Sequence, residues 1–336
     1  MDELLLALRA AAEPTRLRLL ALAARGAFCV VEFTEILGQS QPRLSRHLKL
    51  LCEAGLLERV REGANVWFAL PAADPAAPSA QALLARDLIA RLPPDDPVLE
   101  ADRRQAARVL AERARIASES FRRQGADWDE MRALGLPAAA VEEALLAMLP
   151  LPAAGADGRL PRLIDIGTGT GRLLELLGPR VGVALGVDAS KSMLALARAR
   201  LSRAELAHCS VRLADMYRLP LADGATGAGF DIALMQMVLH YAEDPAGAIA
   251  EAARVLRPGG MLLVSDLVAH DGSALASGFA HRWPGFADAA LHGWMAACGL
   301  DPGPVRRIEG KLTMGLWSAT RAASAVRPAS AAAFAV

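Results

Sequence analysis

The chain has 336 residues, enough for two domains of ordinary size, and 53% of them are hydrophobic, which excludes a chain that is disordered throughout. Its formal net charge is zero, so any surface that binds nucleic acid must be local. Four widely spaced cysteines, an acidic start and the lack of an apolar run of about 20 residues argue against a disulfide scaffold, a signal peptide and a membrane span, so we expect a cytoplasmic protein that does not enter membranes.

Short amphipathic segments fill the first 70 residues. Three helices are predicted, opening near Pro14, Val31 and Ser40, where Pro14 suits a first turn and the Ser40 side chain can cap the third helix. Two strand-like runs, Leu56–Arg61 and Asn65–Leu70, then flank a glycine-containing turn and predict a hairpin. This order predicts a helix-turn-helix followed by a β-hairpin wing.

The third of these helices has two unlike faces. Leu44, Leu48 and Leu51 recur at helical spacing and form an apolar back, whereas the opposite face carries basic and hydrogen-bonding side chains. Such a helix suits entry into the DNA major groove, where base edges present donors and acceptors.

Residues 10–70 resemble the arsenic-repressor (ArsR-type) family of dimeric winged-helix repressors. The resemblance implies a palindromic double-stranded DNA operator as partner, with contacts from the third helix and the wing: Gln41, Arg43, Ser45, Arg46, His47, Arg61 and Asn65. It also implies a homodimer formed through two further helices. One lies before Pro14 and contains Leu4–Leu8, and the other follows the wing and contains Leu84–Leu92.

The chain departs from the metal-sensing members of that family. Those relatives carry two thiolates at the position of Cys29 and Val31, and here the second is missing. One thiolate cannot form the multi-ligand site that a soft metal needs, and the helix over Ser79–Leu92 contains no histidine. We therefore expect no metal site, with Cys29 and Cys52 packed as core residues.

The C-terminal half alternates apolar runs with helical patterns, as in a doubly wound α/β domain. Arg162–Ile166 is predicted as a buried strand that runs into the glycine-rich turn Gly167–Gly171 and then a helix. Glycines are needed where the backbone approaches a ligand closely. Arg172 stands where a dinucleotide-binding fingerprint requires its third glycine, which argues against a nicotinamide-dependent dehydrogenase.

Acidic residues follow two further predicted strands. Asp188 ends the strand over residues 181–187, and Asp215 follows the strand Ser210–Leu213. The carboxyl ends of parallel strands meet at one edge of a sheet, so these acids and the glycine turn predict a nucleoside pocket there. Further strands are predicted over Phe230–Met235 and Met261–Ser265, joined by a helix over Ala246–Leu256.

This series of motifs resembles the class I S-adenosylmethionine-dependent methyltransferases. The resemblance implies a Rossmann-like, mostly parallel sheet flanked by helices, and S-adenosylmethionine as cofactor, with S-adenosylhomocysteine as product or effector. The implied cofactor-binding residues are Asp165, Gly167, Thr168, Gly169, Gly171, Asp188, Ala189, Met193, Asp215, Met216 and Gln236.

Catalytic residues are not defined by these motifs. Methyl transfer from a sulfonium can run on positioning and desolvation without a general base. His240 and His281 fall on the expected substrate side of the sheet and are weak candidates for a base, and for His240 a structural role is favoured over a catalytic one.

We expect four segments in the chain: residues 1–92 as the winged-helix DNA-binding and dimerisation domain, 93–118 as a helical connector, 119–321 as the methyltransferase-like domain, and 322–336 as a disordered tail. The connector region predicts either a helix over Ala101–Arg123 that transmits pocket closure to the DNA-binding domain through a lid near Trp128, or a proline-rich hinge at residues 93–97 that lets the domains move independently.

The whole chain resembles bacterial regulators in which both halves are fused in this order. Two functions remain open on the sequence alone. The first is a transcription regulator that senses S-adenosylmethionine or S-adenosylhomocysteine. The second is an active methyltransferase on a small molecule with an accessory winged-helix domain, since the same cofactor-binding residues serve sensing and catalysis.

Overall fold

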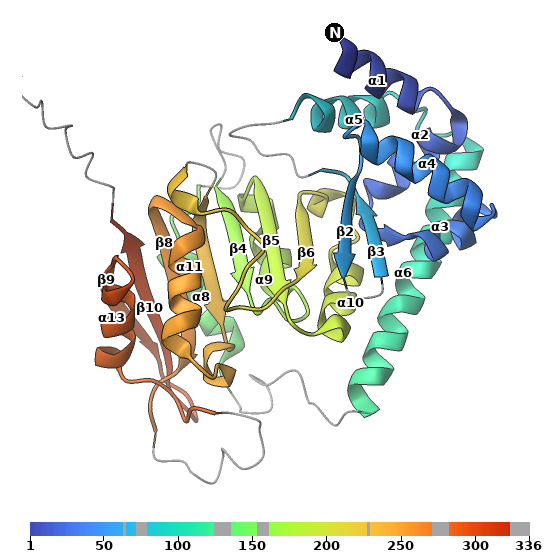
Figure 1. Ribbon diagram of the computed structural model, residues 1–336. Helices are drawn as coiled ribbons and strands as arrows, with labels where there is room; N and C mark the ends of the chain where they lie inside the picture. Colours follow the sequence, from blue (N-terminus) through green and yellow to red (C-terminus); the bar gives the residue numbers. More distant parts are fainter. Residues whose placement is uncertain are drawn as a thin grey trace, which may run out of the picture.

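The computed structural model describes residues 1–62, 65–71, 79–123, 136–152, 161–226, 229–270 and 282–322. Two domains lie side by side, an N-terminal helical domain with a small sheet and a C-terminal domain built on a large sheet (Figure 1). No helix in these ranges is both long and apolar enough to cross a membrane.

The N-terminal domain has six helices and a three-stranded sheet within the described residues. Its elements are α1 (Asp2–Ala11), α2 (Pro14–Ala23), β1 (Phe28–Cys29), α3 (Val30–Leu37), α4 (Gln41–Glu53), β2 (Glu58–Glu62), β3 (Asn65–Ala69), α5 (Ala80–Ala90) and α6 (Pro97–Arg123). The sheet order is β1-β3-β2, all antiparallel, so β2 and β3 form the predicted wing hairpin.

Proline and glycine mark the ends of two of the N-terminal helices. Pro14 is in the first turn of α2, and Gly38 ends α3 in the left-handed region with φ of 65°. Ser40 does occupy the N-cap position of α4, but its side chain makes no capping hydrogen bond, so that part of the expectation is wrong. Proline in the first turn already reduces the number of N–H groups that need a cap.

The long helix α6 is part of the N-terminal core. Ala106, Val109 and Leu110 are buried with the leucines of α2 and α4, among them Leu44, Leu48 and Leu51. Two ion pairs tie α6 to earlier helices: Arg18 to Asp102 at 2.6 Å and Arg113 to Glu32 at 2.6 Å. Because α6 is 27 residues long, the part beyond this core extends along the second domain.

The C-terminal domain is a seven-stranded sheet with helices on both faces (Figure 1). Its strands are β4 (Arg162–Ile166), β5 (Val183–Asp188), β6 (Cys209–Leu213), β7 (Phe230–Gln236), β8 (Leu256–Leu267), β9 (Leu300–Ile308) and β10 (Met314–Arg321). The sheet order is β6-β5-β4-β7-β8-β10-β9, in which β10 is antiparallel to both of its neighbours and the other pairs are parallel. The helices are α8 (Ala138–Met148), α9 (Arg172–Leu177), α10 (Lys191–Arg200), α11 (Pro245–Val255) and α13 (Asp288–Ala297).

The order of the strands reverses beside β4, which pairs with β5 on one side and with β7 on the other. In such sheets, ligands bind outside the carboxyl ends of the strands at this switch point. The turn that follows β4 therefore lies where the fold provides a crevice.

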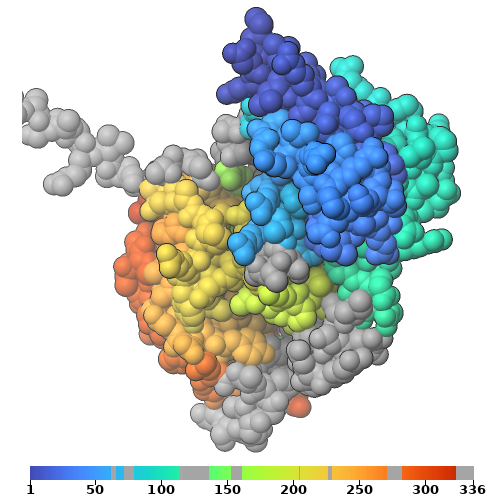
Figure 2. Space-filling view, turned by 45° about the vertical axis from the view of Figure 1, so that its right-hand side comes forward, coloured from blue at the N-terminus to red at the C-terminus, as the bar shows by residue number. Residues whose placement is uncertain are grey.

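The two domains meet along β6, the edge strand of the large sheet. Helix α10 packs along α6, and Arg212 of β6 forms an ion pair with Glu58 of the wing at 3.0 Å. Figure 2 shows the blue N-terminal domain resting directly on the yellow-green part of the C-terminal domain. The wing is thus held against the large sheet in this arrangement.

Candidate cofactor site and DNA-binding surface

The turn after β4 has the backbone that a nucleoside-binding loop needs. Gly167, Gly169 and Gly171 have φ values of 77°, 52° and 74°, a region that side chains with a Cβ rarely adopt. A Cβ on Gly167 would lie 2.3 Å from Val238, whereas a Cβ on Gly169 would point into open space. The space above Gly169 is therefore free to receive a ligand against the bare backbone.

Asp188 ties this loop to the end of β5. One carboxylate oxygen accepts the Gly169 N–H at 2.9 Å, and the other accepts the Ser190 N–H at 2.7 Å. Each oxygen keeps a further lone pair, so the carboxylate can still accept hydrogen bonds from ribose hydroxyls. Burial raises the pKa of Asp188 above its ordinary value.

Asp165 lies beneath the loop. Its side chain is 2% exposed, and one oxygen accepts the Thr168 hydroxyl at 2.7 Å. Burial, with a smaller contribution from the charge of Asp188, raises the pKa of Asp165 to about 7. In this arrangement Asp165 supports the loop from below, and a contact with the methionine end of a cofactor stays a prediction.

The other predicted cofactor residues surround the same edge. Ala189 is exposed between β5 and α10, and the Met193 N–H donates to the Ser190 hydroxyl that caps α10. Asp215 is exposed in a turn after β6, where it accepts the Tyr217 N–H at 3.0 Å. Met216 and Gln236 are half-buried, and Gln236 ends β7 next to the switch point. The described residues of the predicted set thus share one sheet edge.

His240 is wholly buried, and its role as a base stays a prediction. Its Nδ1 is 2.8 Å from one carboxylate oxygen of Asp266, which is also wholly buried at the end of β8. The second oxygen of Asp266 accepts the backbone N–H groups of Leu239 and His240. This network fixes the turn that follows β7, which is a structural role for His240. His281, the other candidate base, lies outside the described residues.

Sequence reasoning missed three residues at this edge. Met237, directly after Gln236, has φ of 49°, a strained value for a residue with a side chain. Val238 lies against the position that a Cβ on Gly167 would occupy, and Asp266 anchors the turn. No pattern in the sequence signals a left-handed methionine, whereas an acid at the end of a predicted strand could have drawn attention to Asp266.

The DNA-binding surface predicted on α4 is open. Leu44, Leu48 and Leu51 are 0% exposed on the inner side of the helix. Gln41, Arg43, Ser45 and Arg46 are all exposed on the outer side. The exposed face therefore offers two guanidinium groups and two neutral hydrogen-bonding side chains at the start of the helix, where base edges are contacted in helix-turn-helix proteins.

The remaining predicted DNA contacts differ in exposure. His47 is half-buried, with Nδ1 3.8 Å from Glu13, and its pKa is lowered chiefly by burial. Arg61 is exposed near the tip of β2, and Asn65 begins β3 opposite Glu62 in the hairpin. The wing tip between them, residues 63–64, lies outside the described residues.

Comparison with known families matches each half separately. Residues 13–59 match the family of bacterial regulatory proteins of the arsR type, and residues 164–264 match the methyltransferase domain. Within this chain, a helix-turn-helix segment of the arsR type is therefore followed by a methyltransferase domain. The predicted fold class is confirmed for both halves.

Curated relatives resemble parts of this fusion. The malonyl-[acyl-carrier protein] O-methyltransferase of Marinomonas sp. (strain MWYL1) is 35% identical over 48% of this chain and 52% of its own length. The arsenite methyltransferase of Aquipseudomonas alcaligenes is 36% identical over 32% of this chain and 33% of its own. The chain thus spans about half or less of these relatives. A putative methyltransferase of Haloferax volcanii, solved with the Trm112 methyltransferase activator, is 19% identical, with a TM-score of 0.48 over 61% of this chain and 96% of that one.

Proposed function

We propose that this chain is a DNA-binding transcription regulator whose affinity for its operator depends on S-adenosylmethionine or S-adenosylhomocysteine in its methyltransferase domain. Two ligands on different domains are coupled only if each prefers one arrangement of the domains. The support is a single helix, α10, that reaches from the cofactor edge to the wing.

The first turn of α10 belongs to the cofactor edge. Ser190 caps the helix through the Met193 N–H, and the Ser190 N–H itself donates to Asp188. A ribose bound at Asp188 competes with, or tightens, the same hydrogen bonds that hold the start of α10. Occupancy therefore acts directly on the position of this helix.

The last turns of α10 contact the DNA-binding domain. The Arg198 guanidinium lies 4.4 Å from the ring centre of Trp67 on β3, and Arg113 of α6 lies 4.8 Å from the same ring. Such cation–π contacts are worth about 0.5–2 kcal/mol each, depending on desolvation. Since α10 has ten residues, it is about 15 Å long. A shift of its first turn at the cofactor edge therefore also moves its last turns against the wing.

This route differs from the expected one. The sequence predicts a coupling along residues 101–123 toward a lid at Trp128, and Trp128 lies outside the described residues. In the structure α6 is joined to the N-terminal core by Asp102 and Arg113, so it serves as the surface on which α10 moves.

The test is a titration of the DNA upstream of the gene with ligand-free protein, with S-adenosylmethionine and with S-adenosylhomocysteine at one salt concentration. A coupling of about 1–3 kcal/mol changes the affinity roughly 5–150-fold. Arg198→Ala should bring the three curves together and leave ligand-free DNA binding intact. Arg203→Ala, an exposed arginine after α10, is the matched control and should keep them apart. Superimposable curves with the unchanged protein would refute the proposal.

Methyl transfer to a small molecule is the second candidate function, and the match to the methyltransferase domain favours it. S-adenosylmethionine would supply a methyl group on a sulfonium. The chain would contribute binding at Asp188, a bare backbone at Gly169 and a rigid turn held by Asp266. None of these groups needs to move a proton, because positioning and exclusion of water suffice for such a displacement. Release of S-adenosylhomocysteine in cell extract measures this activity.

We further propose that the regulator acts as a homodimer on a palindromic operator in the cytoplasm. The support is the exposed apolar side of α1, where Leu4, Leu5 and Leu8 are 53%, 42% and 40% exposed. Leu84 and Leu88 on α5 are only partly buried against the core. Exposed apolar side chains of this kind favour burial against a second copy.

A further inference from the structure

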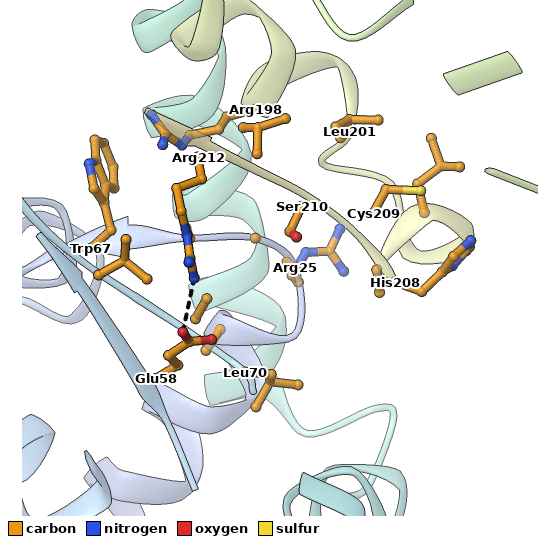
Figure 3. A pocket seen from close by; sticks show the side chains of 18 of the residues that line it. Arg25, Glu58, Trp67, Leu70, Arg198, Leu201, His208, Cys209, Ser210 and Arg212 are labelled. Atoms are coloured by element: carbon orange, nitrogen blue, oxygen red, sulfur yellow. Dashed lines mark hydrogen bonds and ion pairs between the residues drawn. The ribbon is translucent and has the colours of Figure 1, made fainter. Parts of the chain in front are cut away.

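A cleft separates the two domains beneath the wing and is distinct from the cofactor edge. Its volume is about 120 Å³, and Figure 3 shows its walls. One wall comes from the end of α2, the wing and α6, and the other from α10 and the edge strand β6. An occupant of this cleft would touch both domains at once.

The cleft carries an excess of positive charge. Five arginines line it, together with one carboxylate: Arg25, Arg86, Arg113, Arg198, Arg212 and Glu58. Glu58 is already paired with Arg212, and Arg113 is paired with Glu32 outside the cleft. Among the described residues, Arg25 and Arg86 are therefore left without a carboxylate of the lining to balance their charge.

Arg25 and Arg86 have no carboxylate partner among the residues that the structure describes. Arg86 donates only to the backbone oxygens of Ala82 and Pro71, and burial lowers its pKa. The Arg25 guanidinium makes no hydrogen bond within the described part of the chain. It lies in the cleft near Ser210 and also borders a second, more open cavity next to α5. A partly buried guanidinium without a carboxylate partner favours binding of an anion that can accept two parallel hydrogen bonds.

Beside His208 and Ser210, most of the remaining lining is apolar. The aliphatic side chains are those of Val60, Leu70, Leu110, Leu185, Leu201, Leu206 and Val211, and Trp67 closes the end nearest α10. The volume is slightly below the roughly 150 Å³ of a cavity that holds benzene. The cleft therefore fits a small body with an apolar part and one anionic group.

We propose that this cleft is an effector site for a small organic monocarboxylate, with Arg25 as the principal carboxylate-binding residue. The apolar body would lie against Leu201, which follows α10, and Val60 of the wing. Since the occupant bridges both domains, it stabilises the arrangement in which the wing rests on β6. The proposal does not rest on the cofactor response, because binding here requires neither DNA nor S-adenosylmethionine.

The experiment uses the full chain without DNA or cofactor, titrated calorimetrically with propionate and with butyrate. Butyramide serves as the neutral isostere of butyrate, and inorganic phosphate tests for a purely ionic site. We expect at least one carboxylate to bind with a Kd of about 1 mM or tighter, and butyramide to bind at least about tenfold more weakly than butyrate.

Two variants locate the binding. Arg25→Gln should weaken carboxylate binding about tenfold or more, because it removes a charge-assisted hydrogen bond. Ala207→Phe adds bulk at the mouth of the cleft without changing a charge and should also weaken it. Arg104→Gln, an exposed arginine on α6 outside the cleft, is the control and should bind as the unchanged chain does.

Three results would overturn the proposal. The first is that neither carboxylate binds the unchanged chain. The second is equal affinity in Arg25→Gln and the unchanged chain, which would place the site elsewhere. The third is tighter binding of phosphate than of either carboxylate, which would assign the cleft to an inorganic anion.

Discussion

Asp165 places an ionisable carboxyl group beneath the glycine loop, where it is 2% exposed. Its side-chain hydrogen-bond partner among the described residues is the Thr168 hydroxyl, and burial raises its pKa from 3.8 to about 7. A raised pKa means that the folded chain favours the neutral acid, while the unfolded chain ionises freely above pH 4. The free energy of unfolding therefore falls as the pH rises from about 4 to about 7 and is level above that range.

Asp165→Asn should remove this decrease in the free energy of unfolding at high pH, because the amide cannot ionise. At pH 8 the variant should be more stable than the unchanged chain by up to about 4 kcal/mol, the equivalent of three pKa units. Urea unfolding at pH 4 and at pH 8 measures the effect. The gain should be present at pH 8 and absent at pH 4, and an equal change at both would show that ionisation is not its cause.

Asp188 joins the loop to β5 and offers its remaining lone pairs to a ribose. Asp188→Ala should weaken S-adenosylmethionine binding by about 1–3 kcal/mol, since ribose hydroxyls would be left unpaired and the Gly169 N–H would lose its acceptor. Calorimetry with Asp188→Asn, which keeps one acceptor oxygen, should give an intermediate affinity. Unchanged affinity in Asp188→Ala would show that the ribose does not bind at Asp188.

At the scale of elements, α4 separates stability from DNA binding. Arg43 and Arg46 are exposed, so replacing both with alanine should leave the melting temperature nearly unchanged. The same double variant should abolish specific DNA binding, because it removes two groups that can reach phosphates and guanine edges. Fluorescence anisotropy with operator and unrelated DNA checks this. An unchanged footprint would exclude α4 as the recognition helix.

The elements themselves were largely predictable. The strand that became β4 was predicted over the residues that form it, and the predicted wing strands differ from β2 and β3 by one or two residues at their ends. Periodicity carried these predictions, because each element has one buried side. The membership of α6 in the N-terminal core was not predictable, since it depends on distant partners such as Arg18 for Asp102.

The candidate site was predictable where backbone chemistry demands a residue type. Three glycines with positive φ and an acid after β5 follow from the need for close approach to a ligand. The burial of His240 was not predictable, because its partner Asp266 is 26 residues further along the chain. The left-handed Met237 likewise reflects tertiary constraint, as its N–H donates to the Ser265 oxygen of β8.

At the scale of the whole molecule, the exposed leucines of α1 lead us to predict a homodimer. Leu5→Glu with Leu8→Glu should convert a dimer into a monomer, because two charges would be buried in an apolar contact. Light scattering after size-exclusion chromatography measures the mass. Val31→Glu, which alters an exposed apolar residue on α3, is the control and should leave the mass of the dimer unchanged. A monomeric mass for the unchanged chain would contradict the prediction.

The position of β6 has a consequence for how this protein can be divided. Strand β6 is the last strand on its side of the large sheet, and the wing lies against it through the ion pair between Arg212 and Glu58. Uncovered edge strands act as templates for other chains. A methyltransferase domain freed from its N-terminal partner by proteolysis should therefore self-associate, with molecules adding strand to strand at β6. The N-terminal domain therefore also prevents self-association of the methyltransferase domain, and this role does not depend on DNA binding.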